Sequence, residues 1–96
     1  MPITGKQFEL GIDSVMEGWM RRIHQFLTSH KEEAFTVVEL AKELNGMPQK
    51  YQQLGELAVD EAFKVALDKL VEIGAVDSRI IRRERYYALG HVPLPL

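Results

Sequence analysis

Apolar residues recur at three- and four-residue steps in three segments of the chain, which is the spacing of one buried face on an α-helix. The first segment covers residues 14–27, the second 37–44, and the third about 60–73. Their apolar positions are Val15, Met16, Trp19, Met20, Ile23, Phe26 and Leu27; Val37, Leu40, Ala41 and Leu44; and Ala62, Phe63, Ala66, Leu67, Leu70 and Val71. The pattern predicts three main helices, each with one buried face.

Each predicted helix begins beside a residue that can cap its first turn. Ser14 and Thr36 each precede a glutamate by three residues, Glu17 and Glu39, which is the capping-box pattern. Asp60 precedes the third helix, and its carboxylate can accept hydrogen bonds from the free amides there. These residues place the three helix starts.

A pattern typical of a β-hairpin follows the third helix. Gly74 stands where that helix ends, and a residue without a Cβ adopts positive φ there at little steric cost. The next positions are the β-branched or alternating residues Val76, Ser78, Ile80 and Ile81, the turn Arg82-Arg83-Glu84, and Arg85-Tyr86-Tyr87-Ala88-Leu89. We therefore predict a strand, a tight basic turn and a second strand.

The remaining segments are less regular. Phe8 and Ile12 continue the helical spacing upstream, as part of the first helix or as a short separate one, and Gly11 and Asp13 favour a break. Residues 34–36 can supply a short strand, and 49–54 a short helix. Prolines exclude helix and central strand from the end of the chain. We divide the chain into an N-terminal extension (1–13), a folded domain (14–89) and a tail (90–96).

This order of elements resembles the winged helix-turn-helix domains of bacterial and archaeal regulators over residues 14–89. The resemblance rests most on Leu67-x-x-Leu70-x-x-x-Gly74-x-Val76, followed by Arg82-Arg83-Glu84 and Tyr86-Tyr87. It implies a mainly α fold with a small β-hairpin, in which three helices carry a wing of two or three strands. The connection 45–58 departs from the family, because a compact helix-turn-helix uses a turn of a few residues.

Composition excludes several classes of protein. A chain of 96 residues, 46% hydrophobic and 27% charged, is long enough for one globular domain. Without cysteine it has no disulfide or thiolate chemistry, and no apolar run approaches the roughly 20 residues that cross a bilayer. The start lacks the features of a signal peptide. We expect a cytoplasmic protein.

Charge is distributed unevenly along the chain. The net charge is −2, but residues 32–78 hold ten carboxylates against four lysines, whereas residues 79–96 hold four arginines against one glutamate. The local field is positive at the hairpin, so the hairpin is the part of the chain best suited to bind phosphate. The hairpin is therefore the first candidate for contact with nucleic acid.

Arg82 and Arg83, at the turn, are the arginines that we most expect to touch phosphate or the minor groove, because guanidinium groups bind phosphate bidentately. Arg79 and Arg85 are further candidates, with ion pairs to Asp77 or Glu84 as the alternative. All four arginines have an alternative explanation that involves no nucleic acid. Charged residues on an exposed strand edge prevent that edge from pairing with another chain.

In the resembling domains the third helix enters the major groove, which makes Glu61 and Lys64 candidates for base contact. Its outward positions hold four carboxylates against two lysines, a composition that opposes binding to a polyanion. The positions are Asp60, Glu61, Lys64, Val65, Asp68, Lys69 and Glu72. Lys50, in the long connection, is a further candidate if that segment supplies the contact.

Apolar residues outside the folded domain predict a homodimer. They are Phe8, Leu10 and Ile12 before the first main helix, and Val92, Leu94 and Leu96 after the hairpin. A core this small is not expected to cover both sets, so the first set, together with Trp19 on the first main helix, is assigned to a dimer interface.

No motif points to catalysis, and we expect no enzyme activity, cofactor or metal. The chain has no HExxH, phosphate-binding loop, dinucleotide fingerprint or nucleophile elbow. Our hypothesis is a DNA-binding winged helix that regulates transcription as a homodimer and contacts DNA through its basic wing. The alternative is a module that docks on another protein through its acidic third helix and apolar termini.

Overall fold

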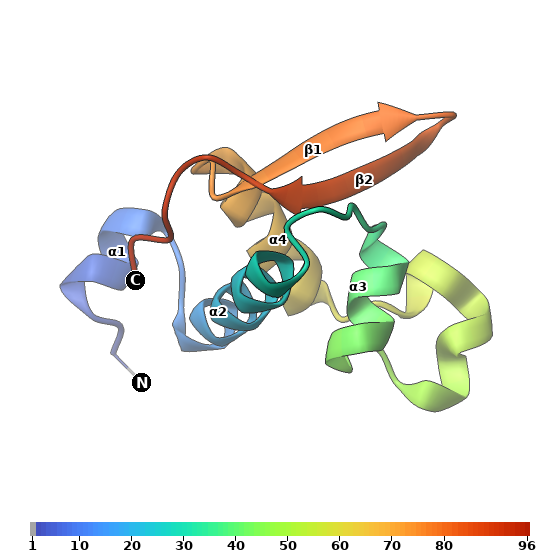
Figure 1. Cartoon of the computed structure of the whole chain (residues 1–96). Coiled ribbons are helices and arrows are strands. Elements are labelled where there is room, and N and C mark those ends of the chain that lie inside the picture. Colours follow the sequence, from blue (N-terminus) through green and yellow to red (C-terminus); the bar gives the residue numbers. More distant parts are fainter. Residues whose placement is uncertain (1) are drawn as a thin grey trace.

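Helices and a single β-hairpin make up the structure, which is a computed structural model that describes residues 2–96 (Figure 1). In chain order the described elements are α1 (Gly5–Leu10), α2 (Ser14–Ser29), α3 (Val37–Leu44), the 3-10 helix η1 (Gln49–Ala58), α4 (Glu61–Glu72), β1 (Val76–Ile81) and β2 (Glu84–Leu89). The fold is therefore a mixture of α and β, as expected.

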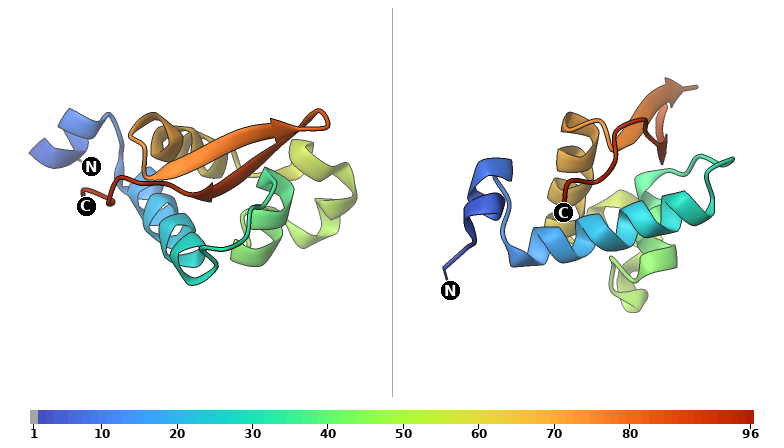
Figure 2. Two further views of the ribbon diagram at one scale, coloured as in Figure 1. Left: turned by 45° about the horizontal axis from the view of Figure 1, so that its top comes forward. Right: turned by 60° about the vertical axis from the view of Figure 1, so that its left-hand side comes forward.

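The core forms where the apolar faces of the three main helices meet the base of the hairpin. Its fully buried large side chains are Met20, Ile23 and Leu27 of α2, Leu40 of α3, Phe63, Leu67 and Leu70 of α4, and Val76 of β1. All of these helix positions belong to the predicted apolar faces. The hairpin leaves this core in one direction, and both ends of the described chain lie at the opposite end of the molecule (Figures 1 and 2).

Two of the three predicted caps are confirmed. Thr36 Oγ1 accepts a hydrogen bond from the Glu39 amide at 3.2 Å, and Glu39 Oε1 accepts one from the Thr36 amide at 2.8 Å. At the start of α4, Asp60 Oδ1 accepts from the Ala62 amide at 2.9 Å. These bonds satisfy amides that have no partner within the helix.

The predicted cap of α2 is wrong by one residue. Asp13, in an extended conformation, accepts a hydrogen bond from the Met16 amide at 2.9 Å, so Ser14 is the first helical residue. Glu17 does not reach back to complete a capping box but accepts from Gln7 Nε2 at 3.3 Å. The buried Gln7 thereby joins α1 to the first turn of α2.

The ends of the chain fold back onto the core to a greater extent than expected. A separate α1 ends at Gly11, as the sequence favours, and Ile12 behind it is only 3% exposed and belongs to the core. Leu10, Leu94 and Leu96 pack against that core. The expectation that this core cannot cover both terminal sets is therefore wrong for these four residues, although Phe8 and Val92 stay exposed.

The connection between α3 and α4 is more structured than the sequence suggests. The 3-10 helix η1 continues beyond the expected 49–54, with a break at Gly55, where φ is +62°. It buries none of its side chains. The expected strand at 34–36 is a single bridge, in which Phe35 and Tyr87 exchange backbone hydrogen bonds of 2.8 and 2.7 Å.

Candidate nucleic-acid interface

The hairpin is buried at its base and exposed towards its tip. The strands pair antiparallel from Val76 opposite Leu89 to Ile81 opposite Glu84. Val76 and Tyr87 are buried, whereas every residue from Arg79 to Arg85 is exposed. The strands slope upwards over α3 towards the tip (Figure 1), so the outer half of the hairpin stands out above the helices. Such a projection can reach into a groove that the body of the protein cannot enter.

The turn at the tip is tighter than predicted and has an unusual backbone. Glu84 belongs to β2, so only Arg82 and Arg83 form the loop. Their φ angles are +51° and +70°. Positive φ at both loop residues is the geometry of a type I′ turn, which normally selects asparagine and glycine. Two arginines in this conformation carry a steric cost that alternative turn residues would avoid.

Arg79 and Arg85 do not form the ion pairs with Asp77 or Glu84 that were the alternative to nucleic-acid contact. Arg79 Nη1 donates to the Ser78 carbonyl and Arg85 Nη1 donates to Ser78 Oγ, both at 3.0 Å. Within residues 2–96, no carboxylate lies within ion-pair distance of any arginine from 79 to 85. Their charge is therefore available to a partner.

The two carboxylates of the hairpin lie beside side chains other than the arginines. Asp77 lies 3.7 Å from His91 Nε2, and Glu84 accepts a hydrogen bond from the Tyr86 hydroxyl at 3.2 Å. That hydrogen bond raises the pKa of Tyr86 above its usual value, and burial, followed by the charge of Asp68, raises the pKa of Tyr87. Both phenols are therefore neutral at physiological pH, and neither adds negative charge to the hairpin.

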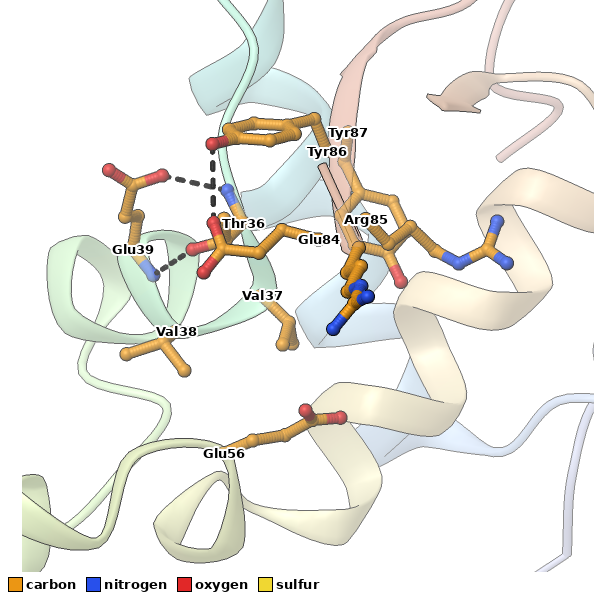
Figure 3. Close-up of a pocket in the computed structure, with 10 residues that line it drawn as sticks. Thr36, Val37, Val38, Glu39, Glu56, Glu84, Arg85, Tyr86 and Tyr87 are labelled. Atoms are coloured by element: carbon orange, nitrogen blue, oxygen red, sulfur yellow. Dashed lines mark hydrogen bonds between the residues drawn. The ribbon is translucent and has the colours of Figure 1, made fainter. Parts of the chain in front are cut away.

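A groove runs between β2 and the start of α3, with η1 on its far side (Figure 3). It encloses about 560 Å³ and is lined by Thr36, Val37, Val38, Glu39, Glu56, Arg83, Glu84, Arg85, Tyr86 and Tyr87. Three glutamates and two arginines share this surface. Because the carboxylates outnumber the guanidinium groups, the groove does not favour phosphate. Of the four hairpin arginines, Arg83 and Arg85 border this groove, whereas Arg79 and Arg82 do not line it.

The surface of α4 stays acidic when its side chains are placed in space. Glu61 and Asp68 are exposed, whereas Lys64 is half-buried. The other lysine, Lys69, pairs with Glu72 at 2.9 Å. This helix therefore presents few free positive charges to a phosphate backbone. Lys50, on η1, lies 5.0 Å from the ring of its neighbour Tyr51 and does not join the hairpin arginines in a described contact.

The residues assigned to a dimer interface are divided between surface and interior. Phe8 is 76% exposed, whereas Ile12 belongs to the core and Leu10 packs against it. Trp19 packs edge-on against Phe63, with ring centroids 5.0 Å apart, and the Arg22 guanidinium lies 4.6 Å from its ring. Of the four, only Phe8 retains a large free apolar surface.

Sequence reasoning missed the exposed apolar residues of the hairpin and of η1. Ile80 and Ile81 are 64% and 55% exposed, and Leu57 is 85% exposed. Consecutive isoleucines next to a tight turn are a signal for the first pair, because alternation places one on each face of the hairpin. Leu57 lies in a segment without periodicity, so its position gave no such signal.

Beyond the hairpin, the described residues offer little for other chemistry. Residues 2–96 contain no group of three His, Asp or Glu side chains placed to hold a metal ion. None of their helices combines the length and apolar character needed to span a bilayer. Comparisons with models of known protein families, with curated proteins and with solved structures found no match for this chain.

Proposed function

We propose that the protein is a winged-helix module that binds duplex DNA through its hairpin and acts in transcriptional regulation. The order of elements supports this assignment, with α2, α3 and α4 as the three main helices, the bridge at Phe35 as a minimal first strand, and β1 and β2 as the wing. Fold alone does not establish a function, so the assignment to DNA depends on the chemistry of the hairpin.

One observation carries the proposal: four guanidinium groups project on the exposed half of the hairpin without a carboxylate partner among residues 2–96. A charge that is already paired must lose its partner before it binds phosphate, whereas these are free to bind. The acidic surface of α4 makes the hairpin, rather than the helix, the main contact. We therefore expect binding dominated by phosphate and weakly dependent on sequence.

The test is a titration of the pure protein against mixed-sequence duplex DNA at several salt concentrations, followed by fluorescence anisotropy. If the four arginines contact phosphates, log affinity falls with log salt with a slope of about −2 to −4. Replacing Arg82→Asn together with Arg83→Gly removes two charges and introduces the pair that a type I′ turn prefers. We expect weaker binding and a slope flatter by about 1–2.

A matched control removes the same charge from another surface. Arg21→Gln with Lys42→Gln changes two exposed side chains of α2 and α3 and lowers the net charge equally. This control should retain the slope of the unmodified protein. The proposal fails if the hairpin variant, still folded, binds DNA with the affinity and slope of the unmodified protein.

A second candidate function is docking on another protein, and η1 is the feature that favours it. Leu57 is 85% exposed and Leu54 is 52% exposed, and no side chain of this helix is buried. Exposed leucines on η1, together with the acidic surface of α4, suit a protein partner better than a polyanion. A protein of this class would bind no duplex DNA in the titration above, even at low salt.

A further inference from the structure

Two isoleucines at the hairpin tip are exposed, although isoleucine is among the residue types most often buried. Ile80 is 64% exposed and Ile81 is 55% exposed. As neighbours on one strand, they point to opposite faces of the hairpin. Their flanking and cross-strand neighbours Arg79 and Arg85 are also exposed, so no other element covers the hairpin here. Each face of the tip therefore carries an uncovered apolar side chain.

Positive charge surrounds this apolar pair. Arg79 precedes it, Arg82 and Arg83 follow it, and Arg85 lies opposite Ile80 on β2. Glu84, opposite Ile81, is the one carboxylate in the segment 79–85, and its side chain accepts the hydrogen bond from Tyr86. An apolar tip ringed by guanidinium groups complements a surface that is anionic outside and apolar within.

Duplex DNA has this combination, because phosphates border its grooves and stacked bases lie between them. We propose that, once the arginines hold the hairpin in a groove, Ile80 and Ile81 wedge between base pairs and kink the duplex. This inference rests on the proposed function and adds DNA deformation to it. Proteins that insert apolar side chains, isoleucine included, into the minor groove bend DNA by about 20–90°.

The local backbone suits such a wedge. The two-residue loop keeps the leading end of the hairpin narrow, since Ile81 and Glu84 already face each other as a strand pair. Burying both isoleucines against bases would remove apolar surface from water, which offsets part of the cost of unstacking a base step. The four arginines supply the attraction to the backbone that brings the tip into place.

The experiment measures DNA bending and DNA binding on the same complex. The probe is a duplex of about 30 base pairs with flexible TA steps at its centre and a fluorophore at each end. For the unmodified protein we expect energy transfer that reports a bend of at least about 20°. The variant Ile80→Thr with Ile81→Thr keeps β-branched side chains and all four arginines, so the hairpin and its charge are retained.

We expect the double variant to bind with an unchanged salt slope and an affinity within about tenfold, but to leave the duplex straight. The control Val15→Thr removes an exposed β-branched apolar residue from α2, and it should leave the bend unchanged. Equal bends for the unmodified protein and the double variant overturn the wedge, as does salt-sensitive binding of a straight duplex by the unmodified protein. Absence of any duplex binding overturns the proposed function and the wedge together.

An anionic membrane also presents negative charge over an apolar interior, and a second arm distinguishes it. Vesicles of phosphatidylglycerol and phosphatidylcholine are sedimented with the unmodified protein and with the double variant. The wedge predicts no difference between the two proteins in this arm. Isoleucine-dependent sedimentation together with a straight duplex overturns the wedge and assigns the two side chains to lipid.

Discussion

At the scale of single residues, the turn of the hairpin is where this chain departs most from local preference. Arg82 and Arg83 both hold positive φ, a region in which the Cβ of an L-residue lies too close to the neighbouring carbonyl. Asparagine and glycine would avoid most of that cost. The chain places guanidinium groups there instead, which is consistent with a contact that needs them.

The first residue-scale prediction is therefore a gain in stability. Arg83→Gly removes the Cβ at a φ of +70°, and we expect it to raise the free energy of unfolding by about 0.5–1 kcal/mol. Urea denaturation followed by circular dichroism measures the change. Arg79→Gly is the control, because it places glycine inside a strand and should destabilise the protein. A loss of stability at both sites would contradict the proposed strain at the turn.

At the scale of elements, most boundaries could be predicted because their causes are local. Thr36 and Glu39 bond within one turn, and Asn45 closes α3 with a φ of +60°, so α3 begins and ends at the predicted residues. The N-cap of α2 is Asp13 instead of the predicted Ser14, because either of these neighbouring residues has a side chain that can cap the helix. The extent of η1 and the reduction of the first strand to one bridge depend on distant packing, which local patterns do not contain.

The candidate site could be predicted only in part for the same reason. The arginines of the turn were found because a tight basic turn has a local signature. The exposure of Ile80 and Ile81 could not be predicted, because strand alternation does not indicate how far the helices extend beneath the hairpin. The missing ion pairs of Arg79 and Arg85 likewise depend on side-chain placement across the sheet.

The helix α4 yields the element-scale prediction. Its surface carries exposed carboxylates, so under the proposed function we expect it to repel DNA held by the hairpin rather than to read its bases. Glu61→Gln should then raise affinity roughly twofold at low salt and equally for all sequences. Affinity selection from a pool of random duplexes measures both quantities. Glu9→Gln on α1, at the end of the molecule away from the hairpin tip, is the control and should have no effect. A changed sequence preference in Glu61→Gln would assign base contact to α4.

At the scale of the whole molecule, the hairpin tip lies at one end and the two ends of the described chain lie at the other (Figure 2). The exposed apolar residues near the chain ends are Ile3, Phe8 and Val92. Two copies that pair through this region would leave both hairpins free. The proposed homodimer thus depends on fewer residues than the sequence suggests, because Ile12 is already buried.

We expect light scattering at micromolar concentration to report a mass near twice 11.0 kDa. Phe8→Asp places a charge on the most exposed residue of this region and should give a monomer that still folds, since Phe8 lies outside the core. Leu57→Asp is the matched control on η1, and it should leave the mass unchanged. A monomeric unmodified protein would rule out this assembly and favour docking on a different protein.

The single bridge between Phe35 and Tyr87 has a further consequence for how copies of the free protein behave. Tyr87 directs its amide and carbonyl towards Phe35, so Arg85, two residues away, directs its own towards open solvent. This stretch of β2 is an unsaturated strand edge, which is a template for aggregation. Like charges on Arg83 and Arg85 repel a second copy that approaches along the edge. The arginines proposed to attract DNA would then also oppose edge-to-edge pairing of unbound copies, and added salt would weaken both effects together.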